Sequence, residues 1–454
     1  MSRRSPLYGW LTSDAISLTG TRVSMIAIPW FVLTTTGSAT QTGLVAFAEL
    51  APLVLLKAMV GPVIDRVGAR RVSITCDLGS VVAIGLVPAL HAAGLLSFPL
   101  LLVLVAIAGA LRGPGDGAKH AYIPTLVEHT GVPMERATGL ASTVERTASM
   151  AGAAFAGGLV AVVGPTNAMA VDAVSFALSA LVLWWSTRSV PPMVAPAPGR
   201  MEPREGYWAE LHTGWDFLRR DPLLLGITLM VAVTNLIDMA YSVVLVPVWA
   251  KETGGGAAAI GLLFAVFSGA SILGSMAAAA WAERMPRYRT YLVAFLLCGA
   301  PRFWILALDT PLWLVLAVAV VGGAASGFLN PILGAVIFER IPRHLVGRVS
   351  SLSTAMCWSL MPLGGLAGGL LISGFGLGWA LVVSGIGYFL ATMAPAMGSR
   401  FRAMDSPERR GHLDEPVVGL ALADAGPHTV PGERPHGDPH PAAGGREVDS
   451  PLPQ

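Results

Sequence analysis

Twelve long apolar runs constrain this chain more than any other feature. About 20 apolar residues in a helix cross the hydrocarbon core of a bilayer. With Gly, Pro and charge clusters taken as breaks, the spans are predicted at residues 10–33, 43–63, 72–90, 96–118, 139–163, 168–185, 223–249, 260–281, 291–308, 312–337, 352–372 and 379–397. Only 13% of the 454 residues are charged and the mean hydropathy is +0.63, whereas a soluble domain has about a quarter charged residues. The sequence therefore predicts an all-α polytopic membrane protein with twelve transmembrane helices.

Positive charge is distributed unequally between alternate connections of these spans. Arg and Lys collect on the cytoplasmic side of membrane proteins. One set of connections and the N-terminus carry eighteen Arg and Lys residues, including Lys119 directly after the fourth span, whereas the other set carries only Lys251. This asymmetry predicts that both termini are cytoplasmic, in a multi-pass protein of the plasma (inner) membrane.

Two regions do not read as spans. The first, residues 186–221, ends in the amphipathic stretch "YWAELHTGWDFLRR", which predicts a helix lying on the cytoplasmic membrane surface. Asp221 and Pro222 then predict an N-cap and first residue for the seventh span. The second region follows Met404 and is too polar and Pro-rich to bury a core. The predicted organisation is a six-helix bundle at 1–185, a cytoplasmic linker at 186–221, a second six-helix bundle at 222–400 and a disordered cytoplasmic tail at 401–454.

The two predicted bundles show signs of an internal repeat. "AGGL" occurs at 156–159 and again at 367–370, each time after a short Arg-bearing loop. Glu283 and Arg284 follow the eighth span as Asp65 and Arg66 follow the second. Two parallel halves of six spans are typical of transporters built by duplication.

One charged loop carries a family resemblance. "GPVIDRVGARR", at 61–71, matches the signature Gly-x-x-x-Asp-Arg-x-Gly-x-Arg-Arg of the major facilitator superfamily, between the second and third spans. The fixed positions are Gly61, Asp65, Arg66, Gly68, Arg70 and Arg71. "IAIPWFVL" in the first span and "GWDFLRRDP" before the seventh resemble the bacterial efflux branch that contains enterobactin exporters and macrolide pumps.

The resemblance implies a function and a mechanism. It implies a secondary active transporter that exports a drug, antibiotic or secondary metabolite by alternating access, with protons as coupling ion. It also implies that Asp65 faces the N-terminus of the eleventh span when the cytoplasmic side is closed, where the helix dipole favours an anion. We call this expected contact the latch.

The chain departs from the family pattern at two places. The second signature is degenerate, retaining Glu283 and Arg284 but having Ala279 in place of glycine. The antiporter motif of the fifth span appears as "GAAFAGG", with Ala153 in place of proline. Proton antiport therefore follows from the family and not from this motif.

Ionisable residues within a span are functional candidates because burying a charge in a membrane is costly. In the first bundle these are Asp14, Arg22, Glu49 and, because the family's fourth span lines the cavity, Arg112. Asp14 begins a polar stripe with Ser17, Thr21 and Ser24 at helical spacing. Two interpretations stay open: the stripe faces a central water-filled cavity and Asp14 or Arg22 contacts substrate or a proton, or Arg22 pairs with an acid such as Glu49 and locks helices together. Glu49 is likewise either a proton site or half of a static ion pair.

The seventh span offers the clearest candidates in the second bundle. Asn235, Asp238 and Ser242 share one helix face near the bilayer centre. The family resemblance adds Asn330 of the tenth span to the cavity. Arg302 is interpreted as structural, and Asp77, Asp116 and Asp309 as hydrated residues at span ends. Gly109, Gly113 and Gly117 predict a helix-packing seam.

Different classes of protein fit less well. The net charge of +2 is spread along the chain, which disfavours a nucleic-acid partner. The sequence contains no HExxH motif and no Walker A loop, so a membrane-embedded enzyme is a remote alternative and no cofactor or metal is expected. A non-transporting sensor is equally remote, and an importer or uniporter with the same fold stays open. The expected partners are a small-molecule substrate, protons and the lipid bilayer, and the expected state is a monomer.

Overall fold

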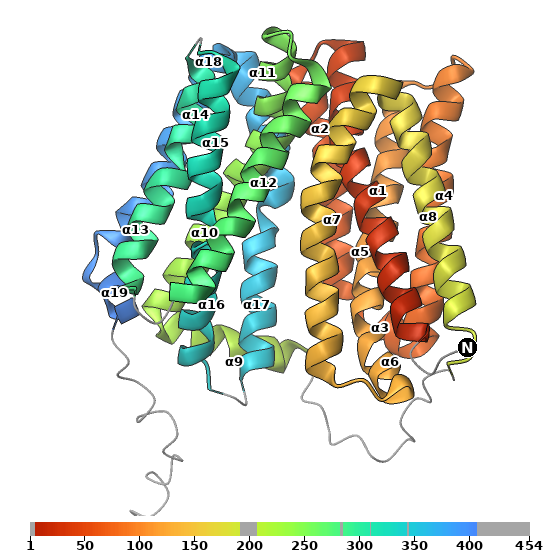
Figure 1. Cartoon of the computed structure of the whole chain (residues 1–454), viewed down its shortest axis with the longest axis horizontal. Coiled ribbons are helices and arrows are strands. Elements are labelled where there is room, and N and C mark those ends of the chain that lie inside the picture. Colours follow the sequence, from red (N-terminus) through yellow and green to blue (C-terminus); the bar gives the residue numbers. More distant parts are fainter. Residues whose placement is uncertain (1–4, 191–206, 282–284, 309, 343–344, 406–454) are drawn as a thin grey trace, which may run out of the picture. The chain divides into compact units, whose positions relative to one another are not determined.

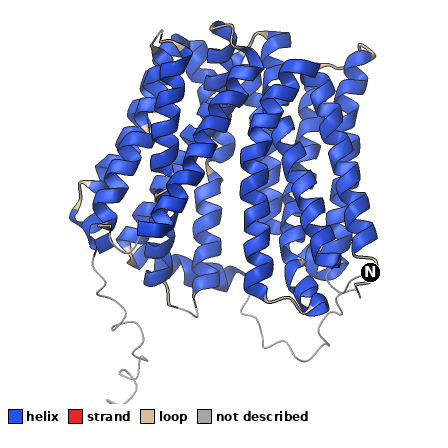
Figure 2. Ribbon diagram, viewed as in Figure 1, coloured by secondary structure: helices blue, strands red, loops and turns tan. Residues whose placement is uncertain are grey.

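The computed structural model describes residues 5–190, 207–281, 285–308, 310–342 and 345–405. These residues are almost entirely helical and contain no strand (Figure 2). The helices of the N-terminal half, residues 5–190, are α1 (Ser5–Thr36), α2 (Ala39–Met59), α3 (Gly61–Val67), α4 (Ala69–Ala92), α5 (Phe98–Ala121), α6 (Ile123–Thr130), α7 (Met134–Val163) and α8 (Pro165–Ser186).

The C-terminal half, residues 207–405, contains more interrupted helices. They are α9 (Tyr207–Arg220), α10 (Pro222–Ala240), the π-helix η1 (Tyr241–Leu245), α11 (Val246–Glu252), α12 (Gly256–Trp281), α13 (Arg287–Cys298), α14 (Ala300–Ala307), α15 (Leu312–Ser326), α16 (Leu329–Arg340), α17 (Val346–Ser359), α18 (Met361–Ala396), α19 (Ser399–Arg402) and the 3₁₀ turn η3 (Ala403–Asp405).

The predicted spans are helical over nearly all their length. Among the described residues, ten helical runs are long and apolar enough to cross a membrane. One of them, Leu352–Pro395, covers the eleventh and nearly all of the twelfth predicted span, because α18 consists of two helical segments that meet at a kink at Gly376, where φ is 77° and ψ is 169°. Helix α7 contains the fifth predicted span. The all-helical, multi-span prediction is therefore confirmed.

The start of the seventh span also follows the sequence. Asp221 caps α10, because its Oδ1 accepts hydrogen bonds from the backbone N–H of Leu223 at 3.0 Å and of Leu224 at 3.2 Å. Helix α9 precedes it, and its Leu218 is fully buried against Leu224, Ile341 and Val349. At this position α9 packs on protein; its placement on the membrane surface stays a prediction. The predicted tail from residue 406 onward lies outside the described residues.

Helices of the same half pack mainly with one another. In the N-terminal half α1 packs against α7 and α8, α4 against α5 and α8, and α2 against α5. In the C-terminal half α10 and α14 pack against α18, and α12 against α15. The halves meet where α2 packs on α18 and α7 on α12.

The contacts between halves are close at one end. Since α1 starts at the N-terminus and α2 runs back, the start of α2 lies at the opposite end (Figure 1). There a Cβ at Gly43 would collide with the carbonyl of Gly365, and one at Gly157 would collide with the backbone of Gly261. At the same end Lys251 Nζ donates to the carbonyl oxygen of Leu33 at 2.8 Å. We call this set of contacts the far-end contact.

Candidate functional site

A buried ion pair joins α2 to α5 in the N-terminal half. Arg112 Nη1 lies 3.0 Å from Glu49 Oε1, and both side chains are more than four-fifths buried. The pair follows from backbone packing: a Cβ at Gly109 would collide with the carbonyl of Glu49, and one at Gly113 with that of Leu53. Helix α5 thus lies directly on α2, and the predicted glycine seam is confirmed at these two positions.

Glu49 pairs with Arg112 and not with Arg22, the partner considered from the sequence. Arg22 Nη1 lies 3.5 Å from the sulfur of Met25, and Arg112 Nη2 approaches the same sulfur at 3.8 Å. The stem of Arg22 packs against Gly152 of α7. The interpretation of an Arg22–Glu49 pair is therefore wrong, because α5 and not α1 presents its arginine to Glu49.

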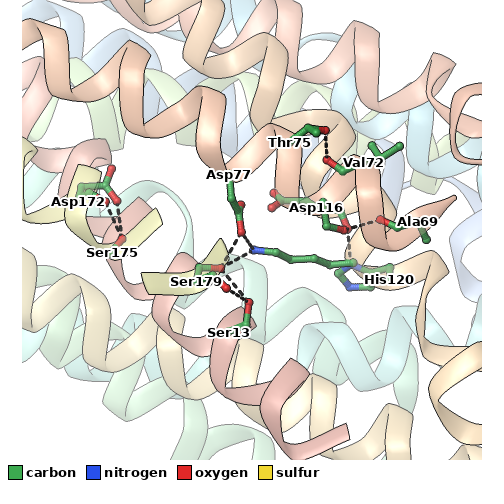
Figure 3. A network of polar contacts seen from close by, with 12 residues as sticks. Ser13, Ala69, Val72, Thr75, Asp77, Asp116, His120, Asp172, Ser175 and Ser179 are labelled. Atoms are coloured by element: carbon green, nitrogen blue, oxygen red, sulfur yellow. Dashed lines mark hydrogen bonds and ion pairs between the residues drawn. The ribbon is translucent and has the colours of Figure 1, made fainter. Parts of the chain in front are cut away.

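A second buried network joins four helices of the N-terminal half (Figure 3). Lys119 Nζ lies 3.2 Å from Asp77 Oδ2 and 3.3 Å from Ser179 Oγ, and Ser179 Oγ donates to Asp77 at 2.7 Å. Ser13 Oγ donates to the carbonyl oxygen of Ser179 at 2.9 Å. The side chain of Lys119 is only 1% exposed.

This network corrects two sequence interpretations. Asp77 is buried and paired, where a hydrated span end was expected, and Lys119 belongs to the same helix packing although it was counted among the loop charges. Asp14 is also buried, and its ionisable neighbours are Lys119, Asp116, His120 and Glu145.

The polar stripe of α1 packs against protein. Ser17, Thr21 and Ser24 are each buried. Ser24 Oγ donates to Asp172 Oδ2 of α8, and Ser175 Oγ donates to Asp172 Oδ1 at 3.1 Å. The stripe thus faces α8 rather than open space. Sequence reasoning missed Asp172, although a lone acid inside the apolar run "MAVDAVSFAL" was a usable signal.

The C-terminal half holds the ion pair of Asp238 and Arg302. Asp238 lies on α10, and Arg302 on α14 donates from Nη2 to Asp238 Oδ1. The side chain of Asp238 is 38% exposed and that of Arg302 only 13%. Asp238 and Ser242 line a cavity of about 250 Å³. Arg302 therefore belongs to the candidate site as well as to the helix packing.

The backbone around this pair departs from regular α-helix. The π-helix η1 follows α10 and begins three residues after Asp238, and such turns are frequent at functional sites. The helical path is interrupted at Gly299, between α13 and α14, and Pro301 lies in the first turn of α14, which carries Arg302. These interruptions set the two charged side chains opposite each other.

Two other candidates of this half lie elsewhere. Asn235 Nδ2 donates to the carbonyl oxygen of Cys357 at 2.9 Å and so joins α10 to α17. Asn330 is exposed on α16. Neither belongs to the lining of the cavity beside Asp238.

The signature residues surround the turn from α3 to α4. Gly68, with a φ of 91°, ends α3, and Arg66 and Arg71 are exposed. Arg70 donates from Nε to Thr187 Oγ1 at 2.8 Å and from Nη2 to the carbonyl oxygen of Trp184 at 3.0 Å. It thus places a cation at the C-terminus of α8, as the helix dipole favours.

Several residues singled out from the sequence lie outside the part of the chain that the structure describes. The described residues do not include the side chain of Asp65, Glu283 and Arg284 of the second signature, or Asp309. Among those that the structure describes, no group of three His, Cys, Asp or Glu side chains could hold a metal ion.

The family model described as "transmembrane secretion effector", of the major facilitator superfamily, matches residues 7–431. The chain belongs to this family. Major facilitator proteins are transporters and not enzymes, so the chain is a multi-pass membrane transporter that acts on a small molecule.

Two similar proteins of the major facilitator superfamily are named for drug efflux. The multidrug efflux pump Tap of Mycobacterium tuberculosis is 27% identical over 379 residues, which cover 83% of this chain and 89% of that protein. The multidrug efflux pump Tap of Mycolicibacterium fortuitum is 26% identical over 408 residues, covering 89% and 98%.

Solved structures support the major facilitator fold. The crystal structure of the nucleoside transporter NupG is similar with a TM-score of 0.66 and 14% identity, covering 89% of this chain and 100% of that one. At this identity the similarity concerns the fold alone. The major facilitator expectation from the sequence is therefore confirmed in family and in fold.

Proposed function

We propose that this transporter exports a small organic molecule, such as a drug, antibiotic or secondary metabolite, by alternating access coupled to proton antiport. Similar proteins named multidrug efflux pumps support the export of drugs. The excess of Arg and Lys on one set of connections supports cytoplasmic termini in the plasma membrane.

The observation that carries the proposal is the far-end contact. The halves touch backbone to backbone at the end opposite the N-terminus, through Gly43 with Gly365 and Gly157 with Gly261. Nearer the N-terminal end, Ser142 and Glu145 of α7 and Asn330 of α16 are exposed. With cytoplasmic termini, this arrangement is closed to the outside and corresponds to the state in which a cytoplasmic substrate enters.

The coupling proton requires a carboxylate whose protonation changes the balance between states. Each half has an acid paired with an arginine inside its spans, Glu49 with Arg112 and Asp238 with Arg302. A proton on either acid removes the ionic attraction in that pair. We propose these acids, together with Asp14, as the proton sites, and Arg22, Asn235 and Asn330 as further contacts for substrate.

The opposite state needs a contact at the cytoplasmic end. In this structure α3 packs against α4 and α5 of its own half. We assign to Asp65 the latch toward the N-terminus of α17, formed when the cytoplasmic ends approach. The organisation proposed around it is a monomer of two six-helix bundles, joined by the linker at 186–221 and followed by a cytoplasmic tail.

The experiment is a drug and metabolite sensitivity profile of cells with and without the protein, repeated with a protonophore. Export predicts higher resistance to some compounds and lower accumulation of them, both abolished by the protonophore. A triple variant, Asp14→Asn, Glu49→Gln and Asp238→Asn, should remove the dependence on the proton gradient. Higher accumulation in cells with the protein would instead indicate import.

A further inference from the structure

The cavity beside Asp238 lies within the C-terminal half, between α10, α12, α14 and α15. Its volume is about 250 Å³, and most of its wall is apolar or aromatic, including Leu263, Phe264, Phe267 and Val318. Ligand sites are typically apolar pockets with a few placed polar groups. Here the charged groups are Asp238 and Arg302, with Ser242 as an additional polar side chain.

The two side chains of the ion pair on this wall differ in their exposed fraction. The side chain of Arg302 is 13% exposed, whereas that of Asp238 is 38% exposed. The guanidinium donates to only one carboxylate oxygen, Oδ1, in the described structure. The cavity therefore offers a ligand negative charge rather than positive charge.

Arg302 has a second source of stabilisation, because aromatic rings surround its guanidinium. Its Cζ lies 4.9 Å from the ring centre of Tyr241, 5.0 Å from that of Phe303, 4.9 Å from that of Tyr388 and 5.9 Å from that of Phe267. Each cation–π contact contributes about 0.5–2 kcal/mol, with the higher values in desolvated sites. We call these four rings the cage.

The cage changes what Asp238 is able to do. An arginine with no other support would need the full negative charge of its partner, because a lone buried charge is unfavourable. The rings supply part of that support from their π faces. Asp238 is therefore able to share its charge with a second cation while Arg302 stays in place.

We propose that this cavity binds the protonated amine of a small hydrophobic compound, with Asp238 as counter-ion and the aromatic walls around its apolar body. An anion would meet the exposed carboxylate first and find the guanidinium enclosed. This proposal adds to the export function a substrate class, protonated amines, and a binding site within the C-terminal half. The role of this cavity in transport rests on the proposed export function. The ionisable groups around Asp238 are Arg302, Tyr241, Tyr388 and Cys298.

The test measures binding to the purified, full-length protein in nanodiscs, with three probes of similar shape. They are phenethylamine, which is a cation at pH 7, neutral phenethyl alcohol and anionic phenylacetate. Empty nanodiscs correct for partition into lipid. We expect the amine to bind at least about tenfold more tightly than the alcohol, a difference of about 1.4 kcal/mol, and the anion to bind most weakly.

Three variants locate the binding. Asp238→Asn should remove the preference for the amine, and Val318→Phe should weaken all three probes by filling the cavity without touching the ion pair. Glu339→Gln, which removes an exposed carboxylate elsewhere, should change nothing. Equal binding of amine and alcohol, or an unchanged amine preference in Asp238→Asn, would overturn the proposal.

The cage is tested with a matched pair at Tyr388. Tyr388→Phe keeps the ring and should bind the amine as the unaltered protein does. Tyr388→Leu removes the ring, so Arg302 should hold Asp238 more strongly and amine affinity should fall several-fold. Equal affinities in the two variants would overturn the role of the cage. Because binding is measured without transport, its failure is distinguishable from a failure of export.

Discussion

Glu49 and Arg112 form an ion pair of 3.0 Å between α2 and α5, in a place that backbone contacts at Gly109 and Gly113 determine. Removing one partner of a buried pair leaves the other charge uncompensated. We expect Arg112→Gln to lower efflux severalfold, because the buried Glu49 carboxylate then loses the cation that compensates its charge. Arg112→Lys, which keeps the charge, should retain more activity.

The check on this pair is efflux from vesicles across a range of external pH. A role in coupling predicts that Glu49→Gln flattens the pH profile while the protein remains folded, as judged by its thermal unfolding. If Glu49→Gln lowered the efflux rate by the same factor at every pH, the pair would contribute to helix packing alone.

The network of Lys119 and Asp77 predicts an effect on stability. Asp77→Asn leaves the ammonium of Lys119 buried without its counter-charge, which should destabilise the protein by about 3 kcal/mol. Adding Lys119→Met should recover most of this loss. Thermal unfolding in detergent measures both.

The exposed pair of Arg287 and Glu339, 2.6 Å apart, provides the control. Exposed ion pairs contribute about 0–1 kcal/mol, so Glu339→Gln should barely change the unfolding temperature. An equal change for Asp77→Asn and Glu339→Gln would show that the buried network has no special role.

The far-end contact predicts a shift between conformations. Gly157→Leu places a side chain against the backbone of Gly261, whereas the neighbouring Gly158 has open space at its Cβ. We therefore expect Gly157→Leu to separate the halves at this end and to reduce transport, and Gly158→Leu to do neither. Distances between spin labels at exposed Thr36 and Trp379, in a variant free of native cysteines, report the separation.

The latch predicts a variant that transports less although the amount of protein inserted in the membrane is unchanged. Asp65→Asn removes the charge that would interact with the N-terminus of α17, so efflux should fall severalfold while membrane insertion stays normal. Quantification of protein in the membrane accompanies the efflux assay. Normal efflux by Asp65→Asn would eliminate the latch.

The sequence predicted the spans, the cap at Asp221 and the seam at Gly109 and Gly113, because each depends on local pattern: hydropathy over about 20 residues, a side chain at a helix start, or spacing on one face. The signature at residues 61–71 predicted the family. These features need no knowledge of which helices are neighbours.

The charged pairs depend on that knowledge. From the sequence, either Arg22 or Arg112 could pair with Glu49. The packing of α5 on α2 brings Arg112 to Glu49. Lys119 resembled a loop charge because it follows an apolar run, yet Asp77 and Ser179 from two other helices enclose it. Asp172 was missed although it lies inside the sixth predicted span, where a lone ionisable residue is by itself a signal.

The central claim, export driven by protons, is tested most directly in inverted membrane vesicles, whose lumen corresponds to the outside of the cell. The compound with the largest effect in the sensitivity profile is added outside, and the lumen is acidified. Proton-coupled export predicts that vesicles with the protein accumulate the compound against its gradient and release it when a protonophore is added. Equal accumulation with and without the acid lumen would contradict proton-coupled export.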